Sequence, residues 1–176
     1  LASEDRDFYK HRGISYQGIL RAFAVNLTRL RVVQGGSTIT QQLAKVLFTD
    51  MERSLRRKIY EAFCATEIEK RYDKQDILSM YLNLIYFGNG AYGVESTAKM
   101  FFGVSVRELD ETECAMIVGV ISNPLYYSPI SNLNNSISKT RRIMKSLVDA
   151  GYMKQEAADR QFQRFLDRWD VVFDEE

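Results

Sequence analysis

The sequence contains little cysteine, proline or histidine. It has two cysteines, two prolines and one histidine in 176 residues. Two cysteines exclude a disulfide framework and a cysteine-based metal cluster. Both lie in helical, apolar contexts, so we expect Cys64 and Cys114 to pack in the interior. So few prolines leave long stretches of the chain free to form helices.

The chain also lacks a dominant charge and a long apolar run. Its net charge is +1, which argues against a nucleic-acid partner. The longest apolar run, Cys114 to Ile121, is far shorter than the ~20 residues of a membrane span. The length suits a single domain over residues 1–176. Because the chain opens inside an apparent element, we expect that this domain is excised from a longer, membrane-anchored protein.

The spacing of apolar residues predicts a mainly α fold. Leu1 to His11 is interpreted as the end of a helix, and Ser15 as the cap of the next one, whose apolar stripe includes Leu20, Phe23 and Leu27. That stripe is typical of a core face, and its flanking arginines leave contact with an anionic membrane surface as a less favoured alternative. Further helices are expected at about 53–72, 73–87, 94–102, 114–121, 137–150 and 154–169. Ser105 with Glu108 and Asp110 with Glu113 have the spacing of capping boxes.

The segment Gln34 to Lys45 has the pattern of a helix that begins after two glycines. Ser37 is predicted to cap a helix beginning at Thr38, whose free N–H groups could hold an anion. Ile39, Leu43, Val46 and Leu47 share an apolar face, and Gln41, Gln42 and Lys45 share the other side. This polar row could hold a phosphorylated, sugar-bearing substrate. The alternative is an amphipathic helix with solvated polar residues.

A basic cluster begins the following helix, and a carboxylate lies one turn further on. Arg53, Arg56, Arg57 and Lys58 precede Glu61, whose other neighbours on the helix are apolar. An unpaired carboxylate there would be costly. One interpretation is an ion pair between Arg57 and Glu61 within the helix, and the other is a functional carboxylate.

The first ten residues contain two further candidates. On a helix, Glu4, Phe8 and His11 would share one face, which would let Glu4 point into a cleft while Phe8 anchors the segment. His11 is the only histidine, and a structural hydrogen bond is its commoner role.

Five segments occur in a characteristic order. They are Glu-Asp-x-x-Phe-x-x-His-x-Gly at 4–13, Gly-Gly-Ser-Thr-Ile-Thr-Gln-Gln-Leu-x-Lys at 35–45, Arg-Lys-x-x-Glu at 57–61, Tyr-Phe-Gly-Asn-Gly-Ala-Tyr-Gly-Val-Glu at 86–95 and Pro-x-x-Tyr-Ser-Pro at 124–129. Together they resemble the peptidoglycan glycosyltransferase (transglycosylase) domain of class A penicillin-binding proteins and monofunctional transglycosylases. The resemblance implies a mainly α fold with a lysozyme-like lobe and a smaller membrane-facing lobe.

The resemblance also implies roles for individual residues. Glu4 matches the general base that activates the 4-hydroxyl of the acceptor sugar in lipid II. Glu61 matches a second carboxylate on the pyrophosphate side, where a divalent metal ion, Mg²⁺ or Mn²⁺, is an option; no organic cofactor is expected. The residues that match substrate-binding positions are Ser37, Thr38, Gln42, Lys45, Arg53, Arg57 and Lys58, together with Asp5 and His11, whose role is positional.

The implied reaction is an inverting transfer with undecaprenyl pyrophosphate as leaving group. Lipid II and the lipid-linked glycan chain would be the substrates, at the outer, periplasmic face of the cell membrane, and a C-terminal transpeptidase domain could follow. One departure is Ser122, where many family members carry a lysine. The competing hypotheses are a lysozyme-like enzyme that cleaves glycan and a non-catalytic module that binds phospholipid or an acidic partner.

Overall fold

The structure, a computed structural model, describes residues 1–29, 35–48 and 54–170. The chain forms two compact units, one made of Leu1 and Ser3–Leu84 and the other of Ala2 and Ile85–Glu176. Each unit is built mainly from helices, which confirms the mainly α prediction.

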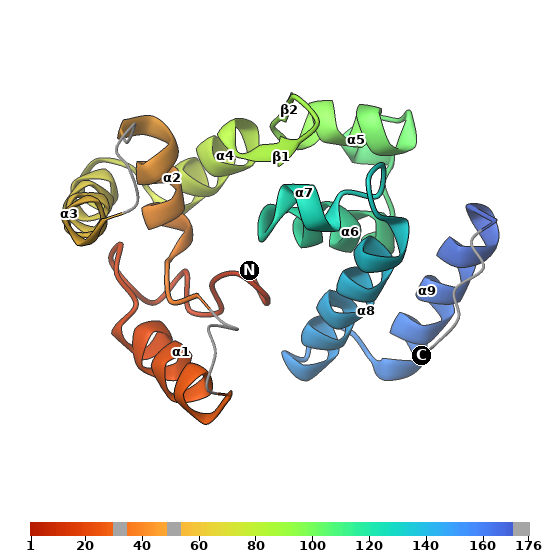
Figure 1. The fold of residues 1–176 in the computed structure, drawn as a ribbon, viewed down its shortest axis with the longest axis horizontal. Helices are drawn as coiled ribbons and strands as arrows, with labels where there is room; N and C mark the ends of the chain where they lie inside the picture. Colours follow the sequence, from red (N-terminus) through yellow and green to blue (C-terminus); the bar gives the residue numbers. More distant parts are fainter. Residues whose placement is uncertain (30–34, 49–53, 171–176) are drawn as a thin grey trace. The chain divides into compact units, whose positions relative to one another are not determined.

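In its described residues, the first unit is built from four helices. They are α1 (Tyr16–Arg29), α2 (Ile39–Phe48), α3 (Leu55–Arg71) and α4 (Lys74–Leu84). Helix α2 packs against both α3 and α4 (Figure 1). Its buried residues Ile39 and Leu43 contribute to the core, as do Ile68 of α3 and Ile77 of α4. Helix α2 is thus the element around which this unit is arranged.

The segment before α1 is not helical, contrary to our prediction. Residues 1–15 form turns, and Phe8 is fully buried among them. The turns are held by hydrogen bonds to distant parts of the chain, which no local helical pattern reveals. Ser15 does cap α1, since its Oγ accepts the backbone N–H of Gly18 at 3.0 Å.

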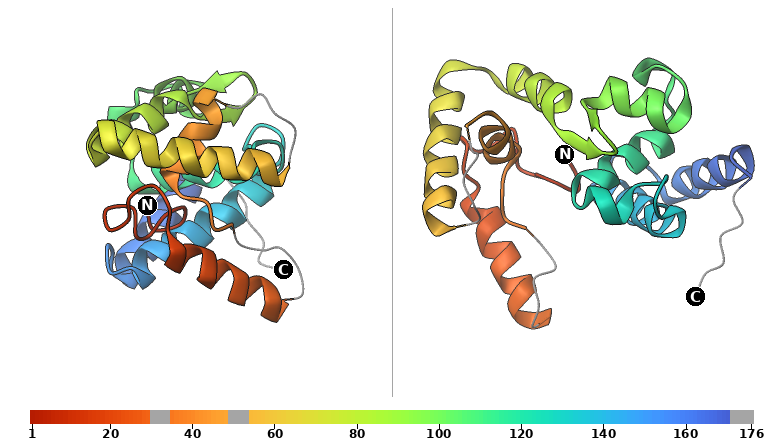
Figure 2. Two further views of the ribbon diagram at one scale, coloured as in Figure 1. Left: turned by 90° about the vertical axis from the view of Figure 1, so that its left-hand side faces the viewer. Right: turned by 45° about the horizontal axis from the view of Figure 1, so that its top comes forward.

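The second unit combines a short hairpin with helices. Its elements are β1 (Tyr86–Gly88), β2 (Ala91–Tyr92), α5 (Val94–Phe102), the 3₁₀ helix η1 (Val106–Glu108), α6 (Glu111–Ile121), α7 (Pro124–Tyr127), α8 (Leu133–Asp149) and α9 (Gln155–Arg168). The strands are antiparallel, with Tyr86 opposite Tyr92. Helix α8 packs against α6 and α9 (Figure 2). The core there includes Met116, Ile137, Met144 and Phe165.

One of the two predicted capping boxes is present. Asp110 caps α6, and Glu113 returns the contact to the Asp110 backbone, as expected. Ser105 makes no cap on η1. Its hydroxyl instead donates to Glu95 Oε2 at 3.2 Å. The same oxygen accepts the backbone N–H of Val106 at 3.0 Å, so Glu95 takes the place of a cap here.

Several apolar residues that we expected in the core lie at the surface. On α1, Leu20, Phe23 and Leu27 are exposed, so the core interpretation of this stripe is wrong. Val46 and Leu47 on α2 are also exposed. Cys114 is exposed whereas Cys64 is buried, so only Cys64 has the predicted packing role. No helix in the described ranges has the length and apolar character needed to span a membrane.

Candidate active site

Thr38, not Ser37, caps helix α2. The Oγ1 of Thr38 accepts the backbone N–H of Gln41 at 3.1 Å, and the Gln41 side chain accepts the N–H of Thr38 at 3.0 Å. The Thr38 hydroxyl also donates to the carbonyl of Gly13 at 2.6 Å. Gly13 has a positive φ of 91°, and a Cβ there would lie 2.9 Å from the Ala65 carbonyl oxygen. Only glycine therefore fits between this cap and α3.

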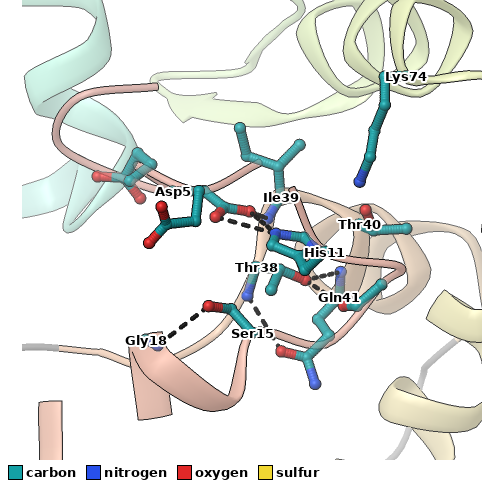
Figure 3. A network of polar contacts seen from close by, with 12 residues as sticks. Asp5, His11, Ser15, Gly18, Thr38, Ile39, Thr40, Gln41 and Lys74 are labelled. Atoms are coloured by element: carbon teal, nitrogen blue, oxygen red, sulfur yellow. Dashed lines mark hydrogen bonds and ion pairs between the residues drawn. The ribbon is translucent and has the colours of Figure 1, made fainter. Parts of the chain in front are cut away.

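The first turn of α2 holds an anion that belongs to the protein itself. Oδ2 of Asp5 accepts the backbone N–H of Ile39 at 3.0 Å. The Nε2 of His11 lies 3.1 and 3.0 Å from the two Asp5 carboxylate oxygens (Figure 3). Asp5 is buried, and a carboxylate at a helix N-terminus is favourable. Our expectation of an open anion site at this terminus is therefore wrong.

Glu4 precedes Asp5 in the chain and contacts the polar side of α2. Its Oε2 accepts the Nε2 of Gln42 at 3.4 Å, and its Oε1 accepts the hydroxyl of Ser3 at 3.3 Å. Glu4 and Gln42 are both half-buried. The Glu4 carboxylate is thus held from one side and can still meet a solvent-borne hydroxyl. The helical face that we predicted for Glu4, Phe8 and His11 is absent, because residues 1–15 form turns.

Tyr81 of α4 is the residue that sequence reasoning missed. Its hydroxyl donates to Oε1 of Gln42 at 2.9 Å. Burial raises the pKa of Tyr81 far above its ordinary value of 10, and the nearby carboxylates of Glu4 and Asp5 raise that pKa further. In the sequence, Tyr81 is only one of the apolar positions of a helix, so nothing there marked it out.

The predicted carboxylate on α3 lies within a cluster of cations. Glu61 is buried, with Oε1 3.0 Å from the Arg57 Nε and Oε2 2.7 Å from the Lys58 Nζ. Lys58 also donates to the Ser37 hydroxyl at 2.7 Å. The ion pair between Arg57 and Glu61 is therefore present, and Lys58 extends it to the segment just before α2. Four predicted residues come together here.

The other predicted positions are less informative. Lys45 lies on the exposed part of α2, about one turn beyond Gln42. Gln41 is buried and bound to Thr38, so it does not belong to the exposed polar row. Arg53 lies outside the described residues.

The residues around Glu61 do not fit a divalent metal. Both of its carboxylate oxygens face cationic side chains, and a metal prefers several oxygen ligands. In the part of the chain that the structure describes, no three His, Cys, Asp or Glu side chains are grouped so as to hold a metal ion. A metal ion at Glu61 therefore stays a prediction from the sequence.

The part of the chain that contains these residues is similar to known proteins. A family model described as Transglycosylase matches residues 1–148. The chain is 45% identical over 156 residues to penicillin-binding protein 1A of Aquifex aeolicus (strain VF5), covering 89% of this chain and 22% of that protein. It is 43% identical over 151 residues to penicillin-binding protein 4 of Bacillus subtilis (strain 168), covering 86% and 24%.

A relative from a third organism gives a similar match. Penicillin-binding protein 1A of Escherichia coli (strain K12) is 40% identical over 160 residues, covering 91% of this chain and 19% of that protein. The chain thus spans about a fifth to a quarter of the length of these relatives. Since the family model matches 148 consecutive residues that include both carboxylates, the chain belongs to the transglycosylase family.

Proposed function

We propose that this domain is a peptidoglycan glycosyltransferase that polymerises lipid II into glycan strands. The main observation behind this proposal is that two carboxylates in different surroundings are both linked by hydrogen bonds to helix α2 or to the segment just before it. Glu4 contacts Gln42 on α2, and Glu61 is linked through Lys58 to Ser37, just before α2. One environment suits proton removal, and the other, rich in cations, suits a leaving diphosphate.

Glu4 is the general base in this proposal. A sugar hydroxyl must lose its proton as it attacks, and a carboxylate within hydrogen-bond reach can accept that proton. Gln42 and Ser3 each donate to one oxygen of Glu4, which leaves lone pairs for the 4-hydroxyl of the acceptor sugar. The half-exposed position of Glu4 admits a substrate.

The cations of α2 and α3 receive the leaving group. Lys58 keeps 47% of its side chain exposed although it binds Glu61, so it can turn toward a phosphate. Arg57 and Lys45 add charge that would stabilise the pyrophosphate as it departs. The anomeric carbon inverts because attack comes from the face opposite the leaving group. A stabilised diphosphate needs no general acid.

The exposed apolar side chains suit a lipid-linked substrate. Leu20, Phe23 and Leu27 on α1 and Leu55 and Ile59 on α3 are all exposed. Apolar helix faces bind the boundary between lipid headgroups and acyl chains. We propose that the domain works at the outer face of the cell membrane, in a longer protein in which a transpeptidase domain follows.

Ser122 takes no part in the proposed phosphate binding. Its hydroxyl donates to the carbonyl of Gly119 at 3.0 Å, and it carries no positive charge. The contact that a lysine makes in many family members is therefore either missing here or supplied by another cation.

The test is polymer formation from lipid II by the purified domain in detergent. The wild-type domain should form polymer, and Glu4→Gln should abolish it while the circular dichroism spectrum stays unchanged. Glu67→Gln is the matched control, because Glu67 is a carboxylate on α3 whose partners are the exposed Lys70 and Arg71. Undiminished polymer from Glu4→Gln would refute the proposal, and soluble fragments released from cell-wall sacculi would favour a glycan hydrolase.

A further inference from the structure

Three side chains from three parts of the first unit form a continuous series of contacts. The Tyr81 hydroxyl on α4 is 2.9 Å from Oε1 of Gln42 on α2. The Nε2 of the same Gln42 is 3.4 Å from Oε2 of Glu4. Helices α2 and α4 pack against each other, and Tyr81 is only 2% exposed. The series therefore begins in the core and ends at the proposed base.

The two ends of the Gln42 amide are determined by their partners. An ionised carboxylate can only accept hydrogen bonds, so Gln42 must turn its NH₂ group toward Glu4. Its carbonyl oxygen then faces Tyr81 and requires a donor there. A reversed amide would place an oxygen against the Glu4 carboxylate, which is repulsive.

Tyr81 is suited to be that donor. Burial, followed by the charges of Glu4 and Asp5, raises the pKa of Tyr81, so its hydroxyl keeps its proton throughout the neutral range. A buried amide oxygen that loses its donor costs free energy, and rotation of the amide is one way to recover a partner. The tyrosine hydroxyl therefore favours one orientation of Gln42 over the other.

We propose that Tyr81 is a positioning residue for the general base: it fixes the orientation of the Gln42 amide, which in turn fixes the carboxylate of Glu4. Tyr81 does not touch the substrate in this arrangement. The inference rests on the proposed function for its effect on catalysis, but the contact series from Tyr81 to Glu4 can be tested without it.

The first experiment is a double-mutant cycle on polymerisation. Tyr81→Phe keeps the buried ring and removes only the hydroxyl. We expect the rate at saturating lipid II to fall about fivefold, as the loss of one hydrogen bond would give, with KM changed less than about twofold. In a Gln42→Met background, Tyr81→Phe should have no further effect, because its route to Glu4 is gone.

A control variant and two possible results decide whether the double-mutant cycle supports the inference. Tyr9→Phe removes a hydroxyl from a residue that is 53% exposed and should retain the wild-type rate. A wild-type rate for Tyr81→Phe, or losses from Tyr81→Phe and Gln42→Met that simply multiply in the double variant, would overturn the inference. A merely structural role for Tyr81 predicts that multiplication.

The second experiment needs no activity. The side-chain NH₂ resonances of Gln42 should shift as Glu4 is titrated with acid, and Glu4→Gln should remove that shift, which separates it from any effect of Asp5. Tyr81→Phe should weaken the response of Gln42. If the wild-type domain makes no polymer, the proposed function fails while this titration still decides the inference. A Gln42 signal that ignores Glu4, or a response that Tyr81→Phe leaves unchanged, would overturn it.

Discussion

The backbone N–H of Ile39 donates to the carboxylate of Asp5 across 34 residues of chain, at 3.0 Å. This bond fixes the first segment of the chain to the start of α2. Glu4 is the residue next to Asp5, so its backbone is held by the same contact. The position of the proposed base thus depends on a neighbour that is itself buried and anchored.

Replacing Asp5 should destabilise the protein. Asp5→Asn keeps the shape of the side chain but removes the charge that faces His11 and the α2 terminus. We expect the free energy of unfolding in urea to fall by about 1–3 kcal/mol. Asp7→Asn is the control, because the exposed Lys10 is one of its partners, and its loss should be under about 1 kcal/mol. Equal losses from both variants would contradict the anchoring role.

The cap of α2 can be tested by comparing two neighbouring hydroxyl residues. Thr38→Val removes the acceptor for the Gln41 N–H and the donor to Gly13. We expect this variant to lose about 1–3 kcal/mol of unfolding free energy. Ser37→Ala leaves the cap intact and removes only a contact with Lys58, so its loss should stay within about 0.5 kcal/mol. The reverse order, measured by denaturant unfolding, would show that Ser37 is the cap.

Tyr81 should make the protein sensitive to alkali. Its folded-state pKa is raised above 10 by burial and by Glu4 and Asp5. Below pH 10 the residue is neutral in both states. Above pH 10 the unfolded chain releases this proton and the folded chain does not, so stability falls as pH rises.

The measurement is urea unfolding between pH 9 and pH 11. Tyr81→Phe should show a shallower decline of stability than the wild type over this interval. Tyr92→Phe, at a position that is 63% exposed, should keep the wild-type slope. Identical slopes for the wild type and Tyr81→Phe would refute the linkage.

Glu95 should make the stability of the protein fall in acid, whereas Tyr81 makes it fall in alkali. The backbone N–H of Val106 is the main cause of its lowered pKa, and Lys99 lowers that pKa further. A lowered folded-state pKa gives stability that is present above the unfolded value of 4.5 and is lost as pH falls. Glu95→Gln should therefore reduce the acid dependence of the melting temperature between pH 5 and pH 3. An unchanged dependence would show that this carboxylate makes no such contribution.

The helices with local end signals could be predicted from the sequence. Asp110 and Glu113 cap α6 through residues three positions apart. Asp73 accepts the N–H groups of Gln75 and Asp76 and so begins α4. Gly103 ends α5 in a left-handed conformation. Each of these contacts is made within a few residues, so the sequence contains the whole signal.

The parts that could not be predicted depend on contacts between distant residues. Thr38 and not Ser37 caps α2, and the Thr38 hydroxyl is held in place by a bond to the carbonyl of Gly13, 25 residues away. Tyr81 joins the site through Gln42, which is 39 residues away. The spacing of apolar residues in α4 and the cap pattern of α2 do not show these contacts. The contact of Tyr81 with Gln42 becomes visible only when α2 packs against α4.

The presence of Asp5 at the first turn of α2 has a consequence for selectivity. The Ile39 amide is bound to Asp5, so in the proposed function a ligand phosphate would depend on ammonium and guanidinium groups at the ends of long, flexible side chains such as Lys45 and Lys58. Groups of that kind recognise negative charge more than they recognise shape. Diphosphate carriers with differing tails should therefore be accepted alike, whereas added salt should weaken their capture steeply.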